Sequence, residues 1–372
     1  MSKAQRLAGT RRFFKRVSII STEAPWEIIS KESATDNEGT NDGRTMISSP
    51  ISAGVDGTNS ASGVVNRPVS SGLANGSDGV GLDSLRWGLT PRNPKLFPRM
   101  SDTDSGSDSP DDAGLGGKQD RHWRSTQDEP GWYSICLDGR VLKTPLGQPL
   151  TLPSQLLAGA VAAEWDAQLK TIAPAQMPLM TLACTSIDQT MAARRDTEEQ
   201  VLAYLATDTT CYWADATEDR VLHRNQTRAW NAVHDACEVL LGDRPAIATG
   251  ATESLLMSRS RPQKGGAGLP HPDQVFASAK SFVEALDAWH LTALASITRE
   301  SKSFLIGASL LTRGIDTKAA VEASRVEEEF QISNWGLVEG GHDYDRLNCS
   351  VQLHSSDLLV KALAVDNDFQ ID

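Results

Sequence analysis

The chain has 372 residues, of which 39% are hydrophobic and 23% charged, as in ordinary globular proteins. Its formal net charge of -12 argues against a nucleic-acid-binding protein, because such proteins present a basic surface to phosphate groups. No apolar run approaches the roughly 18 residues of a membrane-spanning helix, so we expect no membrane insertion.

The amino-terminal residues are basic. No acidic side chain occurs before Glu23, and an Arg-rich, acid-poor start is typical of an organelle-targeting segment. We therefore predict a short targeting leader over residues 1–10. Residues 11–29 are predicted to contain the first strand, because side chains alternate from Phe13 to Ile20 with the two-residue period of a strand. An edge strand of this kind is the alternative explanation of the basic residues.

Residues 30–129 differ sharply in composition from the rest of the chain. Ser, Gly, Asp and Asn dominate, large apolar residues are sparse, and neither helical nor strand periodicity is present. Such a segment buries too little apolar surface to offset its ordering entropy, so we predict a disordered low-complexity insertion. It is either a lineage-specific loop or translated non-coding sequence. Its acidic tract, residues 101–112, would suit a scaffold that recruits a basic partner.

Residues 130–192 are predicted to complete a small amino-terminal domain. Two strands, 133–137 and 140–144, flank Asp138-Gly139, a strong two-residue hairpin signal, and a third short strand follows at 150–152. Ser154 is the expected N-cap of a helix that buries Leu157, Val161 and Trp165, and a second helix follows residue 178. We expect a β-rich α/β domain of two layers.

Residues 193–372 are predicted to form a helical bundle, which makes the fold class α+β. The apolar residues from Val275 to Trp289 step by three and four and indicate a buried helical stripe. Residues 302–311 are apolar nearly all round and are therefore expected at the centre of the bundle. The predicted helices of this part cover residues 198–205, 223–241, 275–289, 302–311 and 317–334, the last of them ending at Gly336.

Motifs of catalysis are absent. The sequence contains no phosphate-binding loop, no nucleophile elbow of a serine hydrolase and no HExxH zinc motif. The five cysteines are widely spaced and form no CxxC pair, so we expect buried thiols in a reducing compartment. We predict no catalytic residue, no cofactor and no bound metal.

One cluster of side chains near the carboxyl end could still carry chemistry. Glu339, His342 and Asp343 lie close together, and a metal-assisted hydrolase centred on them is the alternative function. A solvent-exposed charged surface or a structural ion pair explains such a cluster more simply than a metal site does. The same two explanations apply to the acidic residues 327–329 just upstream. Most tryptophans fall on apolar stripes and are expected in the core, whereas Trp335 at a helix end could anchor a partner.

A series of short motifs is spread over the ordered parts of the chain. They are Arg12-Phe13-Phe14-Lys15, Leu137-Asp-Gly-Arg140, Lys143-Thr-Pro145, Leu152-Pro153, Ala163-Glu-Trp165, Met177-Pro-Leu179, Asp188, Tyr204, Asp208, Lys302-Ser303, Glu327 to Gln331, Trp335-Gly336, Val338-Glu339 and His342-Asp343. Single motifs are short, but their joint order and spacing over roughly 240 residues is specific. Through them the chain, chiefly from Gly131 onward, resembles the ATP synthase F(1) complex assembly factor 2 family.

The resemblance implies a chaperone and not an enzyme. Members of this family bind the unassembled alpha subunit of ATP synthase F(1) in the mitochondrial matrix, and keep it from aggregating until a beta subunit replaces them. They need no nucleotide or metal, and we expect this chain to be monomeric when free. Acidic positions of the carboxyl-terminal signature are implicated in activity and map here onto Glu327 and Glu339. We therefore expect a partner-binding edge formed by Glu327, Trp335, Glu339, His342 and Asp343.

Overall fold

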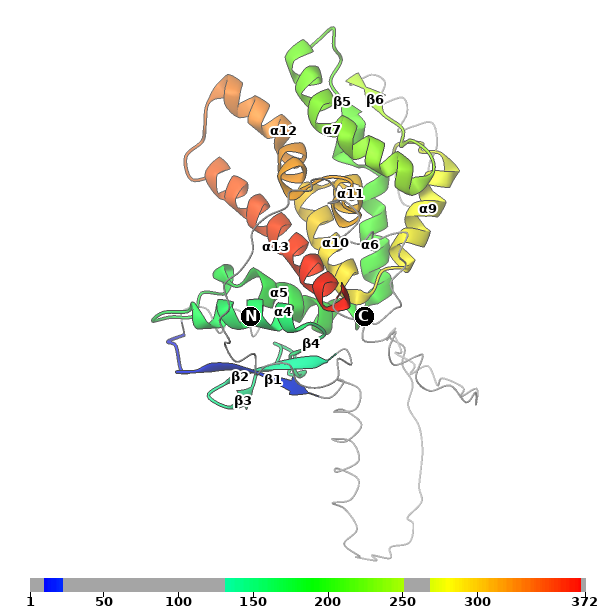
Figure 1. The fold of residues 1–372 in the computed structure, drawn as a ribbon. Coiled ribbons are helices and arrows are strands. Elements are labelled where there is room, and N and C mark those ends of the chain that lie inside the picture. The colour runs from blue at the N-terminus through cyan, green and yellow to red at the C-terminus, as the bar shows by residue number, and fades with distance from the viewer. Residues whose placement is uncertain (1–9, 23–130, 251–267, 369–372) are drawn as a thin grey trace, which may run out of the picture.

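The computed structural model describes residues 10–22, 131–250 and 268–368. A small sheet and two helices form one end of the molecule, and a bundle of longer helices forms the other (Figure 1). The α+β class, with strands in the amino-terminal part and helices after them, is therefore confirmed. The predicted leader, residues 1–10, lies almost wholly outside the described residues.

The sheet is built around β2 (Trp132–Leu137), which pairs antiparallel with β1 (Val17–Thr22), β3 (Arg140–Val141) and β4 (Thr151–Leu152). The first strand starts later than the alternation from Phe13 predicted. The backbone N–H groups of Lys15 and Arg16 donate to the Asp138 carboxylate at 3.0 and 2.8 Å instead of to a neighbouring strand. The pairing ladder therefore begins only at Val17, opposite Leu137.

The predicted insertion lies outside the described residues, and the described residues that flank it on either side lie in the sheet. Thr22, the last described residue before it, pairs with Trp132, which comes just after it. The chain therefore leaves and re-enters the fold at two neighbouring positions. A segment placed in this way can vary in length without moving either strand.

Removing residues 30–128 should leave the thermal unfolding midpoint equal or slightly higher. Lengthening a loop from about 6 to about 100 residues costs roughly 2.5 kcal/mol of closure entropy, so a shorter connection favours the folded state. Thermal scans followed by circular dichroism measure the change. A loss of cooperative unfolding after the deletion would show that the segment contributes to a core.

The predicted hairpin turn is confirmed. Asp138 and Gly139 both adopt positive φ, at 49° and 80°, as the two central residues of a type I′ turn must. No heavy atom lies within 4 Å of a β-carbon built on Gly139, so any cost of substitution there comes from the backbone alone. The Asp138 side chain also ties β1 to this turn through Lys15 and Arg16.

We expect Gly139→Val to lower the free energy of unfolding by about 1–3 kcal/mol, because a β-branched residue is strained at this positive φ. Urea denaturation measures the change. Gly159→Ala is the matched control: Gly159 lies within a helix with open space beside it, so alanine should stabilise by about 0.5–1 kcal/mol. If Gly139→Val shifts stability by only a few tenths of a kcal/mol, the turn is not needed.

Two helices cover the sheet. Ser154 caps α4 (Gln155–Asp166) by accepting from the Leu157 N–H at 3.2 Å, as predicted. A short 3₁₀ helix (Pro174–Gln176), α5 (Pro178–Thr185) and a π-helical turn (Ser186–Thr190) follow. The Glu164 carboxylate binds the first N–H groups of α5, and so joins the two helices.

The bundle begins after this turn. It contains a second small sheet, a pair of parallel two-residue strands that the sequence did not predict. All eight residues of α11 are buried, as predicted. The elements of the bundle are α6 (Arg194–Ala206), a 3₁₀ helix (Thr209–Cys211), β5 (Tyr212–Trp213), α7 (Arg220–Leu241), β6 (Ala248–Thr249), α9 (Asp273–Glu284), α10 (Ala288–Ser301), α11 (Phe304–Leu311), α12 (Thr317–Trp335) and α13 (His342–Asp368).

The predicted stripe from Val275 to Trp289 is buried but belongs to two helices rather than one. The chain breaks between α9 and α10 because Asp287 caps the second helix. Its carboxylate accepts from the His290 N–H at 2.8 Å and contacts the His290 ring at 2.7 Å. The spacing of apolar residues cannot reveal the break between α9 and α10, because the apolar residues on both sides of the break are buried.

The long helix α13 was not predicted. Its buried face carries Ser355, Ser356 and Asp357 among the apolar residues, which interrupts the helical period. Asp357 is satisfied by Arg313, by the Thr317 hydroxyl at 2.6 Å and by Lys361. Burial of the Asp357 carboxylate is therefore tolerated because Arg313 and Thr317, outside α13, supply partners together with Lys361. The Ser355 hydroxyl instead donates within α13 to the Val351 carbonyl at 2.6 Å.

The carboxyl-terminal part of α13 returns to the amino-terminal helices. It packs against α4 and α5, and the Ser154 hydroxyl donates to the Ala362 carbonyl at 2.7 Å. The buried apolar residues form one continuous cluster, which contains Trp165, Trp230 and Trp289 as predicted. The five cysteines are buried and unpaired, also as predicted. Within the described ranges, no helix is long and apolar enough to cross a membrane.

Candidate functional site

Helices α12 and α13 form a hairpin whose turn projects away from the rest of the bundle (Figure 1). Gly336 ends α12, as predicted, because its φ of 87° takes the chain out of helical geometry. The return into α13 is stabilised locally, since the Val338 N–H donates to Nδ1 of His342 at 3.1 Å. We call residues 335–347 the hairpin tip.

The hairpin tip exposes an unusual amount of apolar side chain. Trp335 is 80% exposed, Tyr344 71% and Leu347 61%, and Leu337 and Val338 are exposed between them. Large apolar residues this close together on a surface indicate a protein-binding site more often than chance exposure. Trp335 is exposed at the end of α12, as an anchor for a partner would have to be, and that role stays a prediction.

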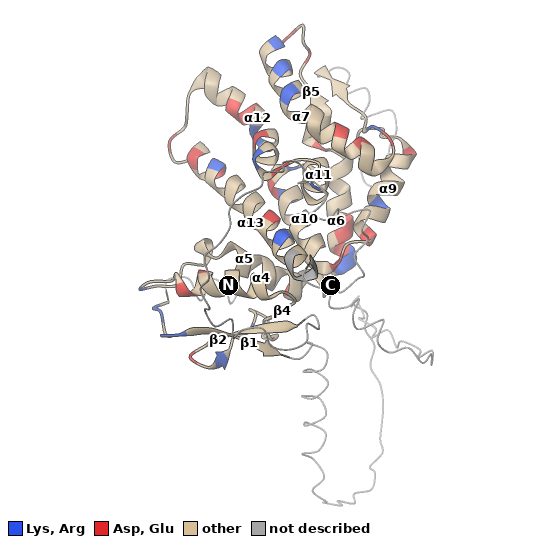
Figure 2. Ribbon diagram, in the orientation of Figure 1, with Lys and Arg blue, Asp and Glu red and all other residues tan. Residues whose placement is uncertain are grey.

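Acidic residues accompany this apolar surface, but they are of two kinds (Figure 2). Glu328 and Glu329 are held by Arg325, and Arg346 adds a two-pronged contact to Glu329. These two acids are structural ion pairs, the simpler explanation offered above. Glu339, at the tip, makes no ion pair with any described residue and is exposed.

The structure brings together four of the five predicted partner-binding residues. Trp335, Glu339, His342 and Asp343 all lie on the hairpin tip. Glu327 does not lie there. It precedes Trp335 by eight positions, about 12 Å along the axis of α12 at 1.5 Å per residue, and faces α7 instead.

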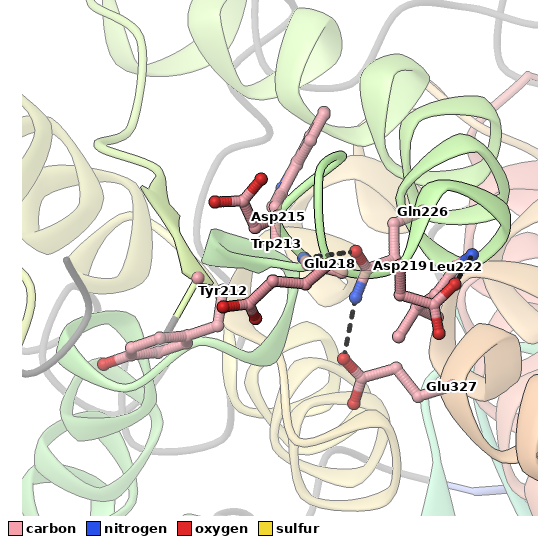
Figure 3. Close-up of a pocket in the computed structure, with 10 residues that line it drawn as sticks. Tyr212, Trp213, Asp215, Glu218, Asp219, Leu222, Gln226 and Glu327 are labelled. Carbon is pink, nitrogen blue, oxygen red and sulfur yellow. Dashed lines mark hydrogen bonds between the residues drawn. The ribbon is translucent and has the colours of Figure 1, made fainter. Parts of the chain in front are cut away.

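Glu327 lies in a pocket of about 340 Å³ between β5, the start of α7 and α12 (Figure 3). Gln226, which is 1% exposed, holds the pocket together. Its amide nitrogen donates to Glu327 Oε1 at 2.9 Å, and its oxygen accepts from the Ala214 N–H at 2.7 Å. The lining residues are Tyr212, Trp213, Ala214, Asp215, Glu218, Asp219, Leu222, Gln226, Gly250 and Glu327.

Two of the acids in the pocket have shifted pKa values, in opposite directions. Burial raises the pKa of Glu327, and the bond from Gln226 only partly opposes this effect. The Thr217 hydroxyl and N–H, both 2.7 Å from Asp215, lower the pKa of that carboxyl. Glu327 nevertheless keeps enough accessible surface to be exposed, and no Lys or Arg of the described residues forms an ion pair with it.

The sequence did not point to this pocket. Tyr212, Trp213 and Glu218 belong to no recognisable motif, and Gln226 is 101 positions from Glu327. A run of acids just before a helix was visible at Asp215, Glu218 and Asp219. Asp219 turns out to be the N-cap of α7, accepting from the Leu222 N–H at 2.9 Å. Nothing local indicates that α12 lies opposite.

The alternative of a metal-assisted hydrolase requires Glu339, His342 and Asp343 to converge. No group of three or more His, Cys, Asp or Glu side chains that could hold a metal ion occurs in the part of the chain that the structure describes. Nδ1 of His342 is engaged by the Val338 N–H. These three residues share the hairpin tip without forming a metal site.

Known proteins resemble this chain along most of its described length. Residues 120–238 match the family model described as ATP12 chaperone protein. "Protein atp12, mitochondrial" of Schizosaccharomyces pombe is 25% identical over 65% of the chain and 82% of its own length, and "Protein ATP12, mitochondrial" of Saccharomyces cerevisiae is 27% identical over 61% and 78%. The crystal structure of Atp12 from Paracoccus denitrificans is 28% identical, with a TM-score of 0.54 over 65% of the chain and 97% of that protein.

Residues 120–238 are therefore similar to ATP12 chaperones, and the two mitochondrial ATP12 proteins and the Paracoccus structure extend the likeness over most of the described chain. These names agree with the chaperone class and the mitochondrial location that the sequence predicted.

Contacts within the fold account for several of the residues that resemble the ATP12 chaperones. Four of the matching acids bind backbone N–H groups and thereby join separate segments. Asp138 joins β1 to the turn, Glu164 joins α4 to α5, Asp188 binds the Leu146 N–H at 3.0 Å, and Asp208 binds two elements of the bundle. Trp335 and Glu339 are exposed and make no such contact within the described chain, and their role in binding a partner stays a prediction.

Proposed function

We propose that this chain is an ATP12-type chaperone that binds the unassembled alpha subunit of ATP synthase F(1) in the mitochondrial matrix. It holds that subunit through the hairpin tip, prevents its aggregation and gives way to the beta subunit. The single observation that carries the proposal is the exposed apolar surface around Trp335, which a free, soluble protein would otherwise bury. The chain is monomeric when free and acts by binding, not by catalysis.

The apolar surface explains why such a chaperone can be displaced. An unassembled subunit exposes the apolar surface that its neighbour will later cover, and an aromatic anchor can cover part of it without any covalent step. Exposed acids such as Glu339 surround the anchor and would pair with Arg or Lys of the partner. Charges of this kind accelerate encounter and exclude wrong partners more than they add affinity.

The direct test is co-expression of the alpha subunit with and without this chain, followed by measurement of soluble alpha subunit and by pull-down. The full chain should keep the alpha subunit soluble, and the alpha subunit should be its dominant partner in a mitochondrial extract. The chain lacking residues 30–128 should do the same, which separates this proposal from that of an acidic scaffold. Stoichiometric metal in the purified protein would instead favour the hydrolase.

We expect Glu339→Gln to weaken binding of the alpha subunit by only a few-fold, because an exposed charge pair contributes under about 1 kcal/mol. The loss should shrink as salt is raised, since screening weakens the wild-type pairing. The unfolding midpoint should not change. Glu322→Gln is the matched control, because Glu322 is an exposed acid on α12 that contacts only Lys318, at 3.9 Å. Equal binding by wild type and Glu339→Gln at low salt would exclude Glu339 from the interface.

A further inference from the structure

The pocket around Glu327 has a lining that the fold alone does not require. Four of its ten lining residues are acidic, two are aromatic and none is basic. In Figure 3 the Glu218 carboxylate lies between Tyr212 and Glu327, so acids approach the space from more than one element. A volume of about 340 Å³ falls at the lower end of ligand-binding pockets.

Glu327 differs from the acids that follow it on α12. Glu328 and Glu329 contact Arg325 within 3.3 Å, whereas Glu327 has the Gln226 amide and, among the described residues, no cation. Gln226 is itself fully buried and is fixed at its other end by Ala214, so it cannot turn away. Glu327 is exposed and is held in place by a neutral donor, so its carboxylate is accessible and has no counter-ion among the described residues.

The arginines of α7 lie on a face of that helix that does not line the pocket. Arg220, Arg224 and Arg228 are exposed on α7 at intervals of four residues and so occupy one face of the helix. Leu222 and Gln226 lie on the opposite face, at 100° per residue, and it is this face that lines the pocket. These three arginines of α7 therefore lie on the face opposite to the one that lines the pocket.

We propose that this pocket binds an arginine side chain of the alpha-subunit segment that the hairpin tip holds, an inference that rests on the function proposed above. Arginine fits better than lysine because its planar guanidinium can bond to carboxylates along its edge and stack on an aromatic ring with its face. The pocket offers both, through Glu327 and Glu218 and through Tyr212 and Trp213. It would supply specificity, while the apolar tip supplies contact area.

The test uses the full chain and a small probe, the peptide acetyl-glycyl-arginyl-glycine amide. NMR titration should give saturable shifts of the side-chain N–H signals of Gln226 and Trp213. The same peptide with citrulline, which has the same shape but no charge, should not shift them. Glu327→Gln and, separately, Glu218→Gln should weaken binding of the arginine peptide roughly tenfold or more, as expected for a charge-assisted contact. Glu322→Gln should leave it unchanged.

The second variant keeps the proposal testable if the first disturbs the bond to Gln226. Equal shifts with arginine and citrulline peptides, or no saturable shift with either up to tens of millimolar peptide, would overturn it. Trp335→Ala should leave peptide binding intact because the tip is about 12 Å from Glu327 along α12. If the tip variant loses the alpha subunit while the peptide never binds, the pocket inference fails and the proposed function stands. If the peptide binds but tip variants hold the alpha subunit normally, the proposed function fails instead.

Discussion

Asp208→Ala should lower the free energy of unfolding by about 3–5 kcal/mol, because several buried donors would each lose their acceptor at about 1–3 kcal/mol apiece before relaxation. Asp208 is fully buried. One carboxylate oxygen accepts from the N–H and hydroxyl of Thr210 at 3.0 and 2.8 Å, and the other accepts from the Leu305 N–H at 2.9 Å. Alanine would leave these three donors without an acceptor in the core.

The position of Asp208 adds to this effect. Leu305 is in the first turn of α11, so the carboxylate also satisfies the positive end of the most buried helix. Burial raises the pKa of Asp208, and the hydrogen bonds from Leu305, Ser303 and Thr210 lower it, so these bonds are what make a carboxylate tolerable there.

Urea denaturation monitored by tryptophan fluorescence measures the loss at Asp208. Asp208→Asn, which keeps the volume and one accepting oxygen, should cost less than alanine, about 1–3 kcal/mol. Asp316→Ala is the matched control, because Asp316 is an exposed N-cap that accepts from the Ala319 N–H at 2.7 Å. It should cost about 1 kcal/mol. Equal effects of the two alanine variants would mean that the Asp208 network contributes no more than an ordinary cap.

The double change Trp335→Ala with Leu347→Ala should weaken binding of the alpha subunit at least about 30-fold. An aromatic anchor and its apolar neighbour commonly contribute 2 kcal/mol or more to a protein interface. Both side chains are exposed, so their removal creates no cavity, and the unfolding midpoint should stay where it is. Titration of immobilised alpha subunit with each variant measures the change in affinity.

The control for the tip is another exposed apolar residue outside the proposed surface. Leu169 is 81% exposed and lies in the amino-terminal part, so Leu169→Ala should leave binding unchanged. Equal losses in the Leu169 and tip variants would indicate nonspecific contact with the alpha subunit. Undiminished binding by the tip variant would remove the hairpin tip from the interface.

Local patterns in the sequence were sufficient for much of the fold. The turn at Asp138-Gly139, the cap at Ser154 and the ends of α12 at Thr317 and Gly336 each depend on residues within a few positions of one another. Their conformations follow from backbone sterics and short-range hydrogen bonds, which the rest of the chain does not change. The apolar segment that became α11 was placed at the centre because it had no polar face to expose.

Only the tertiary structure shows the contacts of residues whose partners are far away in the sequence. The buried polar face of α13 is stable because Arg313 and Thr317 satisfy Asp357, and Glu327 faces a pocket because Gln226 lies opposite on α7. The sequence predicted that Glu327 and Glu339 lie on one partner-binding edge. The length of α12 instead places Glu327 in the pocket and Glu339 on the hairpin tip. Sequence periodicity reports which side of an element is apolar, but which element meets its polar side is decided only when the helices pack.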